Sequence, residues 1–318
     1  MSEKAPFMVF SGTNSRYLAE KICASLNCPL GKMNITHFAD GEFAVSYEES
    51  IRGANVFLVQ STFPNSDNLM ELLLMVDAAK RASAKSVIAV IPYFGWARQD
   101  RKDKPRVSIG AKLVADLLSV AGIDRLITMD LHADQIQGFF NIPVDHLLGA
   151  PVLSNYLKDR IGDNVDEYVA VSPDLGSVTR ARTFATRLGC PLAIVDKRRQ
   201  KANVSEVMNI IGDVRGKKVI LIDDMVDTAG TLCNSAQALI DKGGATEVIA
   251  CATHGVLSGP AIERLQNSCI KELILLDTIP LPPEKAIPKI TLLPVAPLFA
   301  EAIERIYEDK PVSTMYTF

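Results

Sequence analysis

The sequence of 318 residues lacks several patterns that assign a function directly. It contains no Gly-x-x-x-x-Gly-Lys-Ser/Thr motif, which excludes a Walker-type nucleotide site. Its six cysteines form no Cys-x-x-Cys pair, and neither zinc-ligand spacing nor a nucleophile elbow is present. Basic residues do not predominate either. The formal net charge is −3, which argues against a general nucleic-acid binder.

Targeting and membrane segments are also missing from the sequence. The N-terminus, Met-Ser-Glu-Lys-Ala-Pro, lacks the charged-then-apolar layout of a signal peptide, and no apolar run is long enough to span a bilayer. The cysteines are scattered, and several lie in apolar surroundings, as is typical of reduced core residues. We therefore expect a cytoplasmic protein that binds neither nucleic acid nor membranes.

The sequence does contain a regular alternation of strands and helices. Hydrophobic residues make up 48% of the chain and charged residues 22%, so two globular domains are expected. The alternation predicts an α/β fold in which mostly parallel sheets are flanked by helices. It begins again near residue 150, so we expect related domains over 1–149 and 150–297. A C-terminal helix and tail over 298–318 are expected to dock on the first domain.

One stretch combines the features of a ligand site. An apolar run at 219–222 predicts a buried strand, and two carboxylates, Asp223 and Asp224, follow it directly. Residues 228–231 then lead into a helix predicted over 232–242. A parallel strand delivers its carboxyl end to the crevice where open α/β sheets bind ligands, and a helix N-terminus suits a phosphate.

The chemistry of this stretch favours a sugar phosphate. An ordinary capped strand-to-helix turn would explain Asp-x-x-Gly-Thr alone. It does not explain two adjacent acids, which phosphate would repel and which therefore face hydroxyls or a cation. A phosphate at one end and hydroxyls at the other describe a ribose phosphate. The pattern resembles the phosphoribosyl pyrophosphate loop of proteins with the type I phosphoribosyltransferase fold.

Three more polar segments follow predicted strands. Strand alternation would place Asp130 and His132 on one side, where they could contact magnesium or phosphate, although a satisfied surface histidine is the alternative. Charged runs occupy 98–103 and 196–201. A solvated loop is the usual explanation of such runs, but here Arg98 could clamp a polyphosphate. The second run could neutralise charge during phosphoryl transfer.

Seven motifs, in order along nearly the whole chain, are together similar to those of the ribose-phosphate pyrophosphokinases. They are Phe-Ala-Asp-Gly-Glu (38–42), Ala-Arg-Gln-Asp-Arg-Lys (97–102), Thr-Met-Asp-Leu-His-Ala (128–133), Gln-Ile-Gln-Gly-Phe-Phe (135–140), Ser-Pro-Asp (172–174), Asp-Lys-Arg-Arg (196–199) and Asp-Asp-Met-Val-Asp-Thr-Ala-Gly-Thr (223–231). The last motif alone marks only the superfamily. The resemblance implies two tandem phosphoribosyltransferase-like domains. It also implies Mg²⁺-dependent transfer of a diphosphoryl group from ATP to the 1-hydroxyl of ribose 5-phosphate.

The resemblance also assigns residues to roles. Ribose 5-phosphate would be held by Asp223, Asp224, Asp227, Thr228, Ala229, Gly230 and Thr231, together with Arg199. Lys197 and Arg199 would stabilise the transferring phosphates. ATP would be bound by Arg98, Gln99, Asp103 and His132, and by Phe38, Asp40, Gly41 and Glu42 reaching from a neighbouring subunit. Mg²⁺ would be held by Asp130, His132 and Asp174. Sharing of the ATP site implies a homo-oligomer, most often a hexamer.

Departures from the family pattern and rival functions complete the hypothesis. Ser177 stands where many members have glycine, and the 104–108 loop, which contributes to allosteric control in the family, differs from the common form.

One rival function is that of a phosphoribosyltransferase, which would share the 219–231 stretch but would not need the clusters at Arg98 and Lys197. The other is a non-catalytic regulatory relative, which should have lost the sugar-phosphate loop or the catalytic cation.

Overall fold

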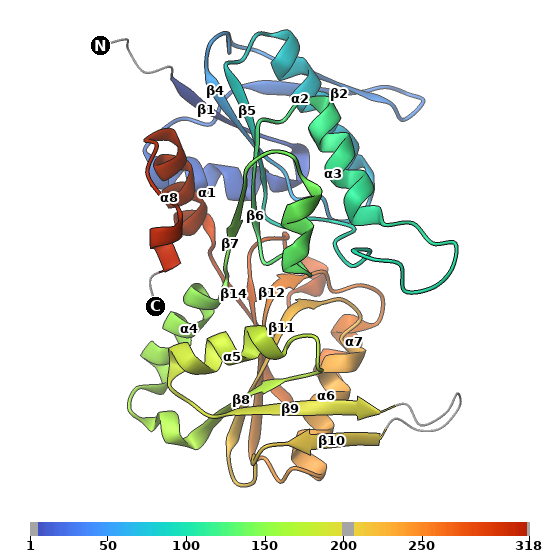
Figure 1. The fold of residues 1–318 in the computed structure, drawn as a ribbon, viewed down its shortest axis with the longest axis vertical. Helices are drawn as coiled ribbons and strands as arrows, with labels where there is room; N and C mark the ends of the chain where they lie inside the picture. The colour runs from blue at the N-terminus through green and yellow to red at the C-terminus, as the bar shows by residue number, and fades with distance from the viewer. Residues whose placement is uncertain (1–5, 199–206, 317–318) are drawn as a thin grey trace. The chain divides into compact units, whose positions relative to one another are not determined.

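The computed structural model describes residues 6–198 and 207–316, which fold as two compact units (Figure 1). Unit 1 comprises Met1–Leu148, Thr278–Pro280 and Val295–Thr317, and unit 2 comprises Gly149–Asp277 and Leu281–Pro294. Within the described ranges, no helix is long and apolar enough to cross a membrane.

Unit 1 is built on a parallel sheet with the strand order β1-β4-β5-β6-β7. Its strands, including those of a separate hairpin, are β1 (Phe7–Ser11), β2 (Met33–His37), β3 (Phe43–Tyr47), β4 (Asn55–Val59), β5 (Ser86–Ile91), β6 (Arg125–Met129) and β7 (Val144–Leu147). Its helices are α1 (Arg16–Leu26), α2 (Asp67–Arg81), α3 (Gly110–Ala121) and α8 (Ala296–Tyr307), with 3₁₀ turns η1 (Thr13–Ser15), η2 (Asp134–Phe139) and η5 (Ser313–Tyr316). The central strands are apolar because helices cover both faces, α1 and α8 on one side and α2 and α3 on the other (Figure 1).

Strands β2 and β3 form an antiparallel hairpin outside the main sheet of unit 1. Tyr47 anchors its base, because the hydroxyl donates to the carbonyl oxygen of Met75 (2.8 Å) and the ring packs edge-on against Phe10. Burial raises the pKa of the Tyr47 hydroxyl above its usual value. The tip, residues 38–42, is exposed.

Unit 2 is built on a larger sheet with the strand order β10-β9-β8-β11-β12-β13-β14, parallel except for the β9–β10 pair. The strands are β8 (Tyr168–Ser172), β9 (Leu192–Arg198), β10 (Val207–Ile211), β11 (Lys218–Val226), β12 (Glu247–Gly255), β13 (Ile270–Leu276) and β14 (Ile290–Leu293). The helices are α4 (Ala150–Ile161), α5 (Val178–Leu188), α6 (Gly230–Asp241) and α7 (Ala261–Asn267), with η3 (Asn164–Glu167) and η4 (Pro283–Lys285). α4 and α5 cover one face, and α6 and α7 the other (Figure 1). The predicted α/β class is thus confirmed.

Candidate functional site

The acidic pair predicted as the centre of the site lies within β11 rather than after it. The apolar run predicts a strand that ends at Ile222, whereas β11 continues through Asp223 and Asp224 to Val226. The extension forms because residues 252–255 of β12 pair with it in parallel register. Both carboxylates are therefore held on a regular strand at the carboxyl end of the sheet of unit 2.

Burial and crowding of charge perturb Asp223. Its Oδ1 accepts hydrogen bonds from Ser177 Oγ (3.0 Å) and from the backbone N–H of Asp224 (2.9 Å). Burial, followed by the nearby carboxylates of Asp224 and Asp174, raises the pKa of Asp223 from 3.8 to about 7. Such a pKa marks a carboxylate whose negative charge is not fully compensated. Hydroxyl donors or a cation from a ligand would therefore favour its ionised form.

Asp224 follows Asp223 on β11, and its carboxylate lies close enough to raise the pKa of Asp223. It is buried on the side of α5, where its Oδ1 lies 3.7 Å from Nη1 of Arg180. Sequence reasoning missed Arg180, because only the fold brings α5 beside this end of β11.

The predicted phosphate turn, Asp227–Thr231, connects β11 to α6, which begins at Gly230 rather than at 232. The carbonyls of Val226 and Asp227 accept hydrogen bonds from the N–H groups of Leu257 and Ser258, both at 2.9 Å. The C=O and N–H of a trans peptide point in opposite directions, so the N–H groups of these two peptides point away from that segment. Together with the helix N-terminus, they can bind an anion.

Asp174 and Ser177 lie between β8 and α5, beside the acidic pair. Asp174 Oδ1 accepts from the backbone N–H of Ser177 (3.0 Å), and the Asp174 carbonyl accepts from Ser172 Oγ (2.6 Å). Ser177, which departs from the family pattern, is buried, and its hydroxyl is the group that reaches Asp223. The serine therefore adds a hydrogen-bond donor at the end of the predicted sugar site.

The second charged run, which begins at Asp196, is predicted to follow a strand, but its first three residues lie within one. β9 continues through Lys197 to Arg198 and pairs antiparallel with β10, with Lys197 opposite Met208. The structure describes only the backbone of Lys197, and Arg199 lies outside the described residues. The roles assigned to these two cations remain predictions.

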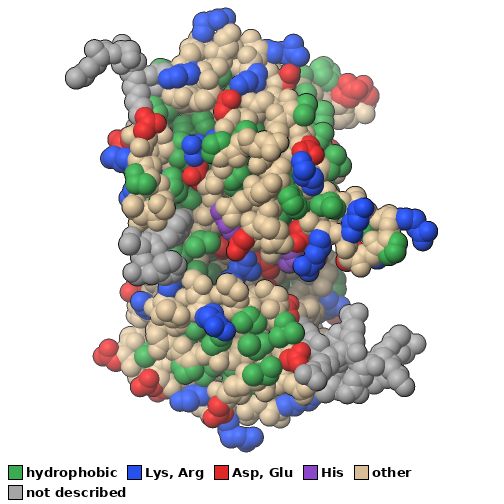
Figure 2. Space-filling view, in the orientation of Figure 1, with side chains coloured by type: hydrophobic (Ala, Val, Ile, Leu, Met, Phe, Trp, Pro, Cys, Tyr) green, Lys and Arg blue, Asp and Glu red, His purple; other side chains and the backbone are tan. Residues whose placement is uncertain are grey.

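In unit 1, the first charged run forms a loop, as predicted, and encloses a hollow of about 550 Å³. Its lining includes four residues predicted to bind ATP, namely Arg98, Gln99, Asp103 and His132. Gln99 Oε1 accepts from the Ser108 hydroxyl (3.2 Å), and a Cβ at Gly110 would lie 2.6 Å from that oxygen, so a side chain there would displace the end of Gln99. Lys and Arg side chains gather on this projecting loop (Figure 2), which gives it the charge to attract polyphosphate.

The Asp130–His132 segment turns sharply, so the strand alternation used to place these side chains on one side does not apply. β6 ends at Met129, and Asp130 has a left-handed φ of 37°. Asp130 is buried, whereas His132 is exposed and lines the hollow. Sequence reasoning missed His146 on β7, whose Nε2 accepts from the backbone N–H of Leu131 (2.9 Å) and thereby fixes the turn.

The hairpin tip carries the other residues predicted to contact ATP. Phe38 is 51% exposed although it is a large apolar side chain. The backbone N–H of Phe38 donates to the carbonyl of Glu42 (2.8 Å), and Asp40 Oδ1 accepts from the N–H of Glu42 (3.0 Å). Gly41 adopts a positive φ of 96°, which closes this turn. An ordered, projecting tip with an exposed ring suits contact with a neighbouring molecule.

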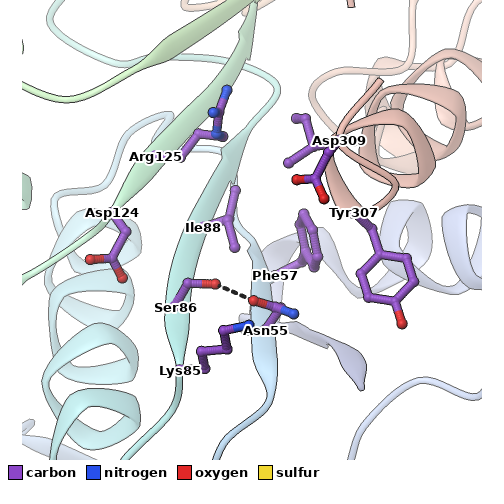
Figure 3. Close-up of a pocket in the computed structure, with 10 residues that line it drawn as sticks. Asn55, Phe57, Lys85, Ser86, Ile88, Asp124, Arg125, Tyr307 and Asp309 are labelled. Carbon is purple, nitrogen blue, oxygen red and sulfur yellow. Dashed lines mark hydrogen bonds between the residues drawn. The ribbon is translucent and has the colours of Figure 1, made fainter. Parts of the chain in front are cut away.

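Another hollow of unit 1, of about 240 Å³, lies at the amino ends of β4, β5 and β6 beside the end of α8 (Figure 3). Asn55, Phe57, Ser86 and Ile88 line it from two adjacent strands, and Ser86 Oγ donates to Asn55 Oδ1 (2.7 Å). It contains none of the predicted site residues. Ligands of open α/β sheets bind at the carboxyl ends of strands, so this hollow is a poorer candidate.

The predicted magnesium residues come from both units of the chain. Within the described residues, no group of three or more His, Cys, Asp or Glu side chains is arranged to hold a metal ion. Asp130 and His132 belong to unit 1, and Asp174 belongs to unit 2. The carboxylate oxygens of Asp130 and Asp174 fit Mg²⁺, which usually keeps several waters and takes one or two carboxylates together with substrate phosphates.

These features define a class of protein. A parallel α/β sheet that ends in a carboxylate pair, followed by a turn that can bind an anion, is the arrangement expected of a protein that binds sugar phosphates. Residues 7–122 match the model of the N-terminal domain of ribose phosphate pyrophosphokinase, and residues 198–317 match that of the phosphoribosyl synthetase-associated domain.

Curated relatives match the whole chain. A ribose-phosphate pyrophosphokinase of Porphyromonas gingivalis is 61% identical over all of both chains, and one of Caldanaerobacter subterraneus is 61% identical over 97% of each. A crystal structure of phosphoribosylpyrophosphate synthetase from Mycobacterium smegmatis has a TM-score of 0.90 at 42% identity, covering 96% of this chain and 99% of that one. The chain belongs to the ribose-phosphate pyrophosphokinase family. The family and activity predicted from the sequence are confirmed.

Proposed function

We propose that this chain transfers the β,γ-diphosphoryl group of ATP to the 1-hydroxyl of ribose 5-phosphate. The products are 5-phosphoribosyl 1-pyrophosphate, used in nucleotide biosynthesis, and AMP. The observation that carries the proposal is the arrangement of β11 and α6. The under-compensated carboxylate of Asp223 lies with Asp224 at the end of the strand, and a turn that can bind an anion follows within a few residues. That arrangement matches the two ends of a sugar phosphate.

Unit 2 binds ribose 5-phosphate in this proposal. Asp223 and Asp224 accept hydrogen bonds from the ribose hydroxyls. Backbone N–H groups of the 227–231 turn and the N-terminus of α6 bind the 5-phosphate. The raised pKa of Asp223 supports this assignment, because hydroxyl donors stabilise the ionised carboxylate and reduce the cost of its burial.

Unit 1 binds the nucleotide. The hollow lined by Arg98, Gln99, Asp103 and His132 takes the phosphates, with Arg98 as the bidentate donor. Phe38 of a neighbouring subunit stacks on the adenine, while Asp40 and Glu42 hydrogen-bond to it. The exposed tip of the β2–β3 hairpin supports this contact, because the ring is presented to solvent rather than to its own core.

Mg²⁺ and two cations complete the chemistry. Asp130, His132 and Asp174 hold Mg²⁺, directly or through water, and bound Mg²⁺ neutralises charge on the phosphates of ATP. Lys197 and Arg199 stabilise the diphosphoryl group as it moves. Phosphoryl transfer needs little covalent help, so holding the two anions in line and screening their repulsion is the main task of these residues.

Self-association follows from sharing the nucleotide site, and we propose a hexamer. A stripe on α3 supports an interface between copies, because Leu113, Leu117 and Val120 recur at helical spacing and are 58%, 41% and 86% exposed. Light scattering should show a hexamer for the wild type and smaller species for a Leu113→Glu, Leu117→Glu variant. The same assay on Asp116→Ala, beside the stripe, serves as the control. A wild-type monomer would contradict the proposal.

The activity is tested by incubating the protein with ATP, ribose 5-phosphate and Mg²⁺. AMP and phosphoribosyl pyrophosphate should form together in equal amounts. Release of pyrophosphate from phosphoribosyl pyrophosphate with a base as acceptor would favour a phosphoribosyltransferase instead. Substrate binding without AMP formation would favour a regulatory relative. The six free cysteines, two of them buried and four half-buried, support a cytoplasmic location, which fractionation of the source cells would test.

A further inference from the structure

We infer that Arg264 on α7 is a positioning residue for the phosphate turn, and this inference rests on the proposed binding of ribose 5-phosphate. Its Nη1 donates a hydrogen bond to the carbonyl of Thr228 (2.9 Å). That carbonyl belongs to the peptide that joins Thr228 to Ala229, at the centre of the turn.

The bond completes a set of three. The carbonyls of Val226 and Asp227 accept from backbone N–H groups of residues 257 and 258, and the carbonyl of Thr228 accepts from Arg264. Three successive peptides therefore direct their carbonyls to the 257–264 segment. Because C=O and N–H are opposed in a trans peptide, all three N–H groups face the other way. That side is where the anion would bind.

The third hydrogen bond, from Arg264, differs from the other two in kind. The first two are backbone bonds that any sequence could make, whereas the third depends on one side chain. It also holds the peptide that precedes Ala229, whose φ is 58°. A left-handed alanine is strained, by an amount comparable to the strength of a hydrogen bond from a charged donor. Without Arg264, rotation of the 228–229 peptide would relieve the strain and turn the Ala229 N–H away from the anion.

The approach of Arg264 also explains a glycine. A Cβ at Gly230 would lie 3.1 Å from Nη1 of Arg264, so a side chain there would crowd the guanidinium. Arg264, Gly230 and Cys233 share a hollow between α6 and α7, on the carbonyl side of the turn. Arg264 therefore acts from behind the turn and does not touch the phosphate.

The inference is tested with Arg264→Ala and Arg264→Lys, with Glu263→Ala on the same helix as the matched control. Titration calorimetry with ribose 5-phosphate should show a loss of affinity of about ten- to a hundredfold for Arg264→Ala. The KM for ATP and the melting temperature should stay close to wild type. The loss should persist at high salt, because it comes from misplaced N–H groups rather than from a missing charge. Arg264→Lys, which keeps the charge but not the fixed donor geometry, should recover only part of the affinity.

A crystal structure of Arg264→Ala without ligand provides a readout that does not depend on the substrate. The 228–229 peptide should be rotated or present in two orientations. Unchanged affinity, a loss abolished by salt, full recovery in Arg264→Lys, or an unaltered peptide would each overturn the inference. Failure of the proposed function would show differently, as a wild-type protein that does not bind ribose 5-phosphate at all.

Discussion

Replacing Asp223 by asparagine should stabilise the ligand-free protein while removing the function of the site. Burial raises the pKa of this carboxyl from 3.8 to about 7, so the folded protein holds its proton more tightly than the unfolded chain. The direction of the pH dependence of folding stability follows from this shift. Stability is lost as pH rises from the unfolded value towards the folded value, and the loss is complete above about pH 7.

The magnitude follows from the size of the shift. A difference of about three pKa units corresponds to an upper limit of about 4 kcal/mol at alkaline pH. Asparagine keeps an oxygen that can accept from Ser177 and from the backbone of Asp224, but its amide must find new acceptors. We therefore expect Asp223→Asn to gain about 1–3 kcal/mol, or about 3–8 °C in melting temperature, at about pH 8.

The assay is thermal unfolding of both proteins from about pH 5 to about pH 8, with a chelator and without substrates. The difference in melting temperature should grow with pH and level off near neutrality. Asp159→Asn, an exposed carboxylate on α4 of the same unit, should show no such trend. A difference independent of pH, or a variant that is less stable at alkaline pH, would refute the reasoning. Calorimetry should show that Asp223→Asn also binds ribose 5-phosphate more weakly.

Three other substitutions test separate parts of the structure. Lys197→Ala should lower turnover by about a thousandfold or more while calorimetry shows nearly intact binding of ribose 5-phosphate; undiminished turnover would exclude its catalytic role. Ser177→Gly should cost about 1–2 kcal/mol in denaturant unfolding, because the hydroxyl bond to Asp223 is lost, yet turnover should persist. Gly95→Ala should destabilise by about 2–3 kcal/mol, because the new Cβ would lie 2.1 Å from the Thr62 carbonyl oxygen, and a neutral effect would contradict that contact.

The elements that sequence patterns predicted well are those with long apolar periodicity. Apolar periodicity over 66–82 predicts a helix, which is α2, Asp67–Arg81, in the structure. The apolar runs at 55–60 and 86–91 predict buried strands, which coincide with β4 and β5. Strands β7 and β14 were not predicted. Each has only four residues: β7 carries Asp145 and His146 and shows no apolar run, and the apolar run of β14 (Ile290–Leu293) is too short to identify a strand. They form because a neighbouring parallel strand supplies their hydrogen bonds.

Within the candidate site, local motifs supplied the candidate residues but did not predict the conformation of the backbone that carries them. The strand through Asp223 is longer than its apolar run because β12 pairs with the extension. The turn at Asp130 breaks strand alternation, because Asp130 takes a left-handed φ and donates its N–H to the carbonyl of Leu147 (3.0 Å). Neither effect is visible in a window of a few residues, because the partner in each case lies on another strand.

The residues that sequence reasoning missed share one property: each acts through a residue distant in the chain. Arg180 lies beside Asp224, His146 fixes the turn at Leu131, and Arg264 holds Thr228. A motif records side chains adjacent in sequence, whereas these three come from other strands and helices. Their role is to orient groups that the motifs already contain, so their chemistry alone gives no signal.

Asp223, whose pKa is raised, and Ala229, whose φ is left-handed, lie a few residues apart at the two ends of the proposed sugar-phosphate site. Each is unfavourable in the free protein, and each is relieved or used when the ligand binds. Hydroxyl donors compensate the carboxylate, and the strained turn directs N–H groups at the phosphate. A ligand lacking either end would gain from only one of them. The site should therefore discriminate against free ribose and against inorganic phosphate by more than the loss of a single contact.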